Sequence, residues 1–161
     1  MVRRSPRNRK DRWRYSKPCH KRTRVGSPPE MKLLLDTHIF LWSLLEPGRL
    51  TPAVARVLQD PTNELWLSPI MVWEVLILAE KGRVVLQPEP LTWIRQALSI
   101  VPFREAPLTG EVAIQSRRVN LPHQDPVDRF LVATALVYDL ILVTADERIL
   151  NTRPVRVLPN R

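Results

Sequence analysis

Cysteine and long apolar segments are nearly absent from this 161-residue chain. Its one cysteine, Cys19, excludes an intrachain disulfide and a cysteine-based metal site, and this cysteine usage fits a reducing cytoplasm. The longest apolar stretch, residues 70–79, contains Glu74 and is too short to span a bilayer. We therefore expect a cytoplasmic protein with no membrane partner.

Glycine is also scarce. Only Gly48, Gly82 and Gly110 occur after residue 30, and they lie far apart. Loops that hold nucleotide phosphates need clustered glycines, so the sequence contains no such phosphate loop. It also shows no internal repeat.

Acidic residues are rare in residues 1–30, which hold 11 Lys/Arg but only Asp11 and Glu30. This difference of +9 equals the formal net charge of the whole chain, so the rest of the chain is neutral. The segment has few aliphatic residues and no apolar signal-peptide core, and we expect a disordered basic leader that could bind RNA phosphates. Alternatively, translation starts at Met31, which we favour because Lys-Leu-Leu-Leu-Asp follows it directly as a first strand would.

Residues 31–161 alternate between short apolar runs and helical patterns, as expected for one domain. Strands are predicted at 33–35, 64–67, 101–103, 140–144 and 155–158, with helices between them. The all-apolar run Leu33–Leu35 is typical of a strand covered on both faces. The pattern predicts an α/β fold, a three-layer α/β/α sandwich around a mainly parallel sheet.

Two acids follow predicted central strands. Asp36 ends the first strand, and Asp146 lies two residues after the 140–144 strand. Ligands bind outside the carboxyl ends of the strands in open α/β sheets, so both acids point to that rim. Each could instead be the N-cap of the helix that follows it.

Two further acids lie on predicted helices. Glu74 is the only ionisable residue between Pro69 and Glu80, and a carboxylate on that apolar face is costly to bury without a partner; alternatively, it lies on a wet edge of the helix. In the segment LPHQDPVDRFLVATAL, Asp125 fits an N-cap before Pro126, and Asp128 fits the first turn, where the helix dipole favours negative charge.

Four carboxylates at one rim would repel each other without a counterion. Mg²⁺ and Mn²⁺ prefer such an all-oxygen environment, and they can orient a phosphodiester and activate water. The set Asp36, Glu74, Asp128 and Asp146 therefore indicates nuclease chemistry.

The body of the chain resembles a PIN-domain ribonuclease, specifically the VapC-type toxin of bacterial toxin–antitoxin pairs. The matching segments occur in order: LLLDTHIFLW, SPIMVWEVLILAEKGR, LPHQDPVDRFLVATAL and LILVTADERIL. The resemblance implies hydrolysis of RNA at a Mg²⁺ or Mn²⁺ centre. Its catalytic and metal-binding acids would be Asp36, Glu74, Asp128 and Asp146, with Asp125 as a second-ranked ligand and the Thr144 hydroxyl in support.

The same resemblance implies that the free toxin inhibits translation and growth. It further implies a cognate antitoxin that blocks the active groove, and a homodimer as the toxin's own state. Phe40, Trp42, Trp73 and Trp93 could supply such contacts, although core burial is the default for each.

Other residues have open assignments. Arg129 could contact a substrate phosphate or form a salt bridge. For His38 and His123 a solvated or structural role is favoured over that of a general base. The alternative function is a catalytically inactive PIN-fold module that binds RNA or protein, and a haloacid-dehalogenase-like phosphatase is disfavoured because His38 occupies the position of its second aspartate.

Overall fold

The computed structural model describes residues 31–152 and 155–161, so the predicted basic leader lies outside the described residues. The strands are β1 (Lys32–Leu35), β2 (Glu64–Leu67), β3 (Arg104–Glu105), β4 (Ile141–Thr144) and β5 (Val157–Pro159). The helices are α1 (Thr37–Leu45), a 3₁₀ turn η2 (Pro47–Arg49), α2 (Pro52–Gln59), α3 (Pro69–Glu80), α4 (Pro90–Ile100), α5 (Gly110–Arg118), α6 (Pro126–Val137) and α7 (Glu147–Thr152).

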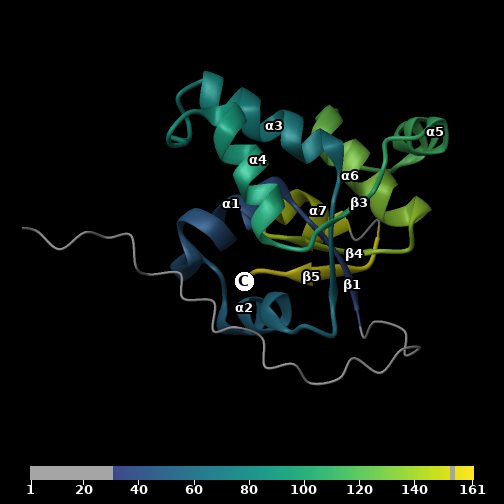
Figure 1. Ribbon diagram of the computed structural model, residues 1–161. Coiled ribbons are helices and arrows are strands. Elements are labelled where there is room, and N and C mark those ends of the chain that lie inside the picture. The colour runs from purple at the N-terminus through teal and green to yellow at the C-terminus, as the bar shows by residue number, and fades with distance from the viewer. Residues whose placement is uncertain (1–30, 153–154) are drawn as a thin grey trace, which may run out of the picture.

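The five strands form one sheet in the order β3-β2-β1-β4-β5, and every neighbouring pair is parallel. Helices pack around this sheet, as Figure 1 shows. The predicted α/β sandwich with a mainly parallel sheet is confirmed. Among the described helices, none has the length and apolar character needed to cross a bilayer.

The two central strands form the middle of the core because both of their faces are covered. Leu33, Leu34 and Leu35 of β1 are essentially inaccessible to solvent, and so are Leu142 and Val143 of β4. Their continuous apolar sequence is the pattern expected for buried parallel strands.

The register of β1 and β4 places the ends of these strands side by side. Leu35 pairs with Val143, and the Asp36 N–H donates to the Val143 carbonyl at 3.1 Å. Asp36 and Thr144, which follow these two residues, therefore emerge together at the carboxyl end of the sheet.

The predicted strand at 101–103 was wrong by a few residues, because pairing with β2 begins only at Arg104. Val101 is the C-cap of α4, and the Phe103 N–H turns back to the Val101 carbonyl at 2.7 Å. Pro102 has no N–H to offer a ladder. The last strand is likewise displaced from 155–158 to Val157–Pro159, at the other edge of the sheet.

Candidate active site

Asp36 and Thr144 form the centre of the site. The Thr144 hydroxyl donates to Asp36 Oδ2 at 2.6 Å, and both residues are buried, with Asp36 only 6% exposed. Asp36 occupies the N-cap position of α1, but its side chain makes no capping hydrogen bond there. The Asp36 carboxylate therefore faces Thr144 at the end of β4 and does not cap α1.

Asp146 lies beside this pair through the same threonine. Its N–H donates to Thr144 Oγ1 at 3.0 Å, so one hydroxyl links the segments of two acids. Asp146 is also the cap of α7, since its Oδ1 accepts the Arg148 N–H at 2.8 Å. The capping role predicted as an alternative for Asp146 is present, and it holds the carboxylate at the same rim.

Glu74 reaches the site from α3. Its Oε2 accepts a hydrogen bond from the hydroxyl of Thr37, the residue that directly follows Asp36. Glu74 is half-buried, and its helix neighbours Met71 and Val75 are fully buried. The carboxylate thus faces the interior side of α3, next to the start of α1.

Asp128 reaches the site from the first turn of α6 and is 8% exposed. Its Oδ2 lies 2.6 Å from His123 Nε2, so this histidine contacts a predicted ligand. Asp125 caps the same helix, because its Oδ1 accepts the Val127 N–H at 3.0 Å. The capping prediction for Asp125 is confirmed. Asp128 is the more buried of the two acids.

Burial and mutual repulsion raise the pKa values of three of these acids. For Asp36, Glu74 and Asp128, burial is the largest cause that raises the pKa. Neighbouring carboxylates raise these pKa values further, by smaller amounts. The pKa of Asp36 is raised by Asp146, and that of Glu74 by Asp36 and Asp128. The pKa of Asp128 is raised by Asp125, Asp146 and Asp36. The acids therefore share one electrostatic region.

Arg148 is a member of the site that the sequence analysis missed. Its Nη2 donates to Asp146 Oδ2 at 2.6 Å and to Asp128 Oδ2 at 3.1 Å, which bridges acids from α6 and from the start of α7. Hydrogen bonds from Arg148 lower the pKa of Asp146. The pKa values of the other three acids are raised. The only signal in the sequence was an arginine two residues after a predicted ligand, in Asp-Glu-Arg.

Arg129 does not face the acids. Its guanidinium is buried and donates to the carbonyls of Ser116 at 3.0 Å and of Val119 at 2.8 Å, at the C-terminal end of α5. Longer contacts reach the carbonyls of Arg117 and His123, both at 3.4 Å. This placement supports neither a phosphate contact nor a salt bridge. Arg129 instead joins α6 to the C-terminal end of α5 through hydrogen bonds.

The two histidines have separate surroundings. His38 is exposed and lies against Trp42, with 5.8 Å between the ring centroids. His123 is held against Asp128, and its Nδ1 has no hydrogen-bond partner within residues 31–152 and 155–161.

The donor set suits a hard divalent cation in kind, because four carboxylates lie at one partly buried rim and neighbouring acids raise the pKa values of three of them. Within the described residues, however, no three His, Cys, Asp or Glu side chains are placed closely enough to hold a metal ion. Asp128 and Asp146 are turned toward Arg148, and Asp36 and Glu74 toward their threonines. The carboxylates are the right ligand type for such an ion. Their hydrogen bonds to Arg148 and to the threonines account for their present orientation.

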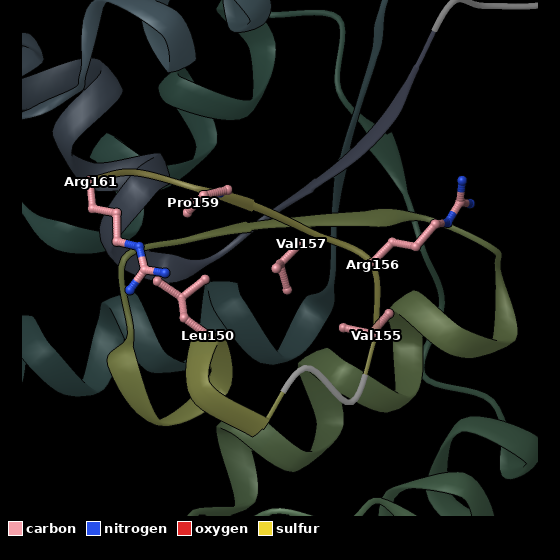
Figure 2. Close-up of a pocket in the computed structure, with 6 residues that line it drawn as sticks. All are labelled: Leu150, Val155, Arg156, Val157, Pro159 and Arg161. Atoms are coloured by element: carbon pink, nitrogen blue, oxygen red, sulfur yellow. The ribbon is translucent and has the colours of Figure 1, made fainter.

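A pocket of about 320 Å³ lies elsewhere, at the β5 edge of the sheet. Figure 2 shows Arg156 and Arg161 at its two ends, with Val157 and Leu150 between them. None of the predicted acids lines it. This pocket is therefore separate from the candidate active site.

The chain is similar to known proteins in both sequence and fold. The PIN domain family model matches residues 33–153. Ribonuclease VapC22 of Mycobacterium tuberculosis (strain ATCC 25618 / H37Rv) is 35% identical over 127 residues, which cover 77% of this chain and 94% of the relative.

Two solved structures share the fold at low sequence identity. One is VapBC2 from Rickettsia felis bound to a promoter DNA fragment, with a TM-score of 0.61 and 12% identity, covering 80% of this chain and 98% of the matched chain. The other is DNA-bound VapBC from Salmonella typhimurium, with a TM-score of 0.60 and 19% identity, covering 81% and 99%. The chain belongs to the PIN-domain family and is a homologue of the VapC ribonucleases.

Proposed function

We propose that this protein is a metal-dependent endoribonuclease that acts in the cytoplasm as the toxin of a toxin–antitoxin pair. The observation that carries the proposal is the convergence of Asp36, Glu74, Asp128 and Asp146 at the carboxyl ends of β1 and β4. The homology to a VapC ribonuclease supports RNA as the substrate.

Asp36, Glu74, Asp128 and Asp146 would hold Mg²⁺ or Mn²⁺, with Asp125 as a second-ranked, outer contributor. When bound, the ion would orient the phosphodiester, lower the pKa of a bound water and offset charge on the leaving oxygen. The ion would also favour the ionised carboxylates, which burial alone disfavours.

The chain's own residues orient these carboxylates. Thr144 holds Asp36, Thr37 holds Glu74, and His123 holds Asp128. Rigid support of this kind keeps the acids close to a productive arrangement. Thr144 is then a supporting residue whose hydroxyl fixes a ligand and does not itself react with RNA.

RNA cleavage by the full chain is the direct test. Sequencing of RNA 5′ ends after induction should reveal new ends with 5′-phosphates, and these ends should disappear in Asp36→Asn and Glu74→Gln. Glu80→Gln is the matched control, because Glu80 is an exposed acid at the far end of the same helix. In vitro, EDTA should stop cleavage and added Mg²⁺ or Mn²⁺ should restore it.

Full activity of an Asp36→Asn/Asp128→Asn double variant would refute the proposed nuclease centre. If the wild type binds RNA but never cuts it, the protein is instead an inactive PIN-fold binding module. The retention of four acids argues against that alternative, since without metal they would repel RNA phosphates.

An antitoxin and a homodimer are the proposed protein partners. Support comes from the VapBC complexes among the structural relatives and from apolar side chains exposed on α3 and α4. Of the four predicted aromatic contacts, Phe40 is buried in the core, Trp42 and Trp93 are half-buried, and Trp73 is 51% exposed. Size-exclusion chromatography with and without a candidate antitoxin would test both partners, and a strictly monomeric chain would contradict the homodimer.

A further inference from the structure

Arg148 is the second residue of α7, and its guanidinium already occupies the acidic rim. Nη2 is 2.6 Å from Asp146 Oδ2 and 3.1 Å from Asp128 Oδ2, and Nε lies 3.1 and 3.2 Å from the two oxygens of Asp146. A single positive side chain therefore offsets part of the negative charge on two carboxylates, one from α6 and one from the start of α7.

Arg148 occupies carboxylate oxygens that could otherwise bind a divalent cation. Nη2 uses Oδ2 of both Asp128 and Asp146, so an ion held between these carboxylates would lie very close to the guanidinium. Two cations at such a distance repel strongly in a partly buried site. The guanidinium bridge and a metal ion at the same two carboxylates would therefore compete.

The Arg148 side chain can leave without disturbing the fold. It is 51% exposed, and its Nη1 has no hydrogen-bond acceptor within the described parts of the chain. Helix α7 is anchored independently, because the Ile149 and Leu150 N–H groups bind the Asp146 carbonyl and both side chains are buried.

We propose that Arg148 is a built-in counter-cation of the Asp128–Asp146 pair, which competes with the divalent ion and must leave Asp128 when that ion binds. This inference rests on the proposed metal-dependent function. It assigns Arg148 a role in setting metal affinity, and it accounts for the present orientation of the Asp128 and Asp146 carboxylates toward Arg148.

The test is a calorimetric titration of Mn²⁺ into the full-length protein without RNA, for the wild type and Arg148→Ala. We expect Arg148→Ala to bind Mn²⁺ roughly three- to tenfold more tightly, since it removes a partly exposed, two-acid ion pair that competes for the site. Arg148→Lys, which keeps the charge but not the planar fork, should lie between the two. Equal or weaker binding by Arg148→Ala would overturn the inference.

Arg161→Ala is the matched control. Arg161 is equally exposed, at 51%, and pairs at 3.1 Å with Glu147 of the same helix without touching a predicted ligand. Its replacement removes the same charge from the same neighbourhood, so it should change Mn²⁺ affinity by less than about twofold. A change as large as that of Arg148→Ala would reduce the effect to general electrostatics and overturn the inference.

Thermal melting gives a second readout. In EDTA, Arg148→Ala should melt at a lower temperature than the wild type, because Asp128 and Asp146 lose their counter-cation. Added Mn²⁺ should raise the melting temperature of Arg148→Ala by more than it raises that of the wild type. A rise in melting temperature in EDTA would contradict the proposed role.

The outcomes separate this inference from the proposed function. If the affinities shift as expected but no variant cuts RNA, the ribonuclease proposal fails and the role of Arg148 stands. If RNA is cut but Arg148→Ala binds Mn²⁺ as the wild type does, the role of Arg148 fails alone. If no variant binds Mn²⁺, the inference fails with the metal site.

Discussion

Thr144 joins the acidic residues at the smallest scale. Its hydroxyl donates to the Asp36 carboxylate and accepts the Asp146 N–H, so one buried side chain fixes two acids that are 110 positions apart in the chain numbering. A buried hydroxyl with both capacities satisfied contributes to order as well as to stability. The hydrogen bonds of Thr144 therefore hold the Asp36 carboxylate in place, although burial disfavours its charge.

Asp36→Asn should stabilise the metal-free protein at neutral pH. Burial raises the pKa of Asp36, and the hydrogen bond from Thr144 only partly offsets this. The folded protein therefore holds the proton more tightly than the unfolded chain, and the stability that this proton provides is lost as pH rises from the unfolded pKa of about 3.9 through the folded value. The asparagine side chain of the variant cannot ionise and avoids this loss.

Urea denaturation in EDTA, from about pH 4 to about pH 7, should show the advantage of Asp36→Asn growing with pH. Asp60→Asn is a control of opposite sign, because hydrogen bonds from Thr62 lower the pKa of the exposed Asp60. A variant at Asp36 that is less stable than the wild type at pH 7 without metal would contradict the electrostatic account.

At the scale of elements, charged side chains bind the C-terminal end of α5 and the N-terminal end of α6. Asp125 caps the N-terminus of α6, and Arg129 of the same helix binds carbonyls at the C-terminus of α5. These helices make the most extensive helix–helix contact among the described elements. The loop between them carries His123, which therefore reaches Asp128 in a fixed position.

Asp125→Ala should lower the free energy of unfolding by about 1 kcal/mol, the usual cost of removing an N-cap. Asp125→Asn keeps a capping oxygen and should retain both stability and RNA cleavage. Chemical denaturation and a cleavage assay on the two variants separate the two roles. Loss of cleavage in Asp125→Asn at unchanged stability would make Asp125 a direct metal ligand and not only an outer contributor.

Arg129→Met should destabilise the protein by about 2–4 kcal/mol, because buried carbonyls lose a charged donor. Arg129→Lys should recover only part of this, since a single ammonium cannot reach carbonyls spread over Ser116 to Val119. The control is Arg118→Ala, an exposed residue of α5 that should have little effect. If Arg129→Met weakened RNA binding without a loss of stability, a phosphate contact would be correct after all.

At the scale of the whole molecule, the C-terminal residues close the fold around the site. The Asn160 N–H donates to the Thr144 carbonyl at 2.9 Å, which extends the β4–β5 pairing to the strand end that carries the site. The Asn160 side chain accepts from the Thr51 N–H at 2.7 Å and donates to the Arg49 carbonyl at 3.0 Å. The end of the chain thereby ties the segment between α1 and α2 to the sheet.

Asn160→Ala should therefore cost about 1 kcal/mol of unfolding free energy, as expected when two partly buried backbone groups lose their hydrogen-bond partners. Asn160→Asp retains an acceptor for Thr51 but loses the donor to Arg49, and its loss should be intermediate at neutral pH. Thermal denaturation of the full chain measures both. An unchanged melting temperature in Asn160→Ala would show that this tie is not needed for the fold.

The sequence alone determined the two central strands and indicated which acids are candidates for the site. The apolar runs of β1 and β4, the cap at Asp125 and the lone acid at Glu74 are encoded within a few residues, by burial on both faces, by capping chemistry and by the cost of an unpaired charge. Only the tertiary structure decided that Arg148 bridges Asp128 and Asp146 and that Arg129 binds α5. Long, flexible arginine side chains take whichever acceptors packing brings within reach, and those acceptors include groups on other elements that no local pattern specifies.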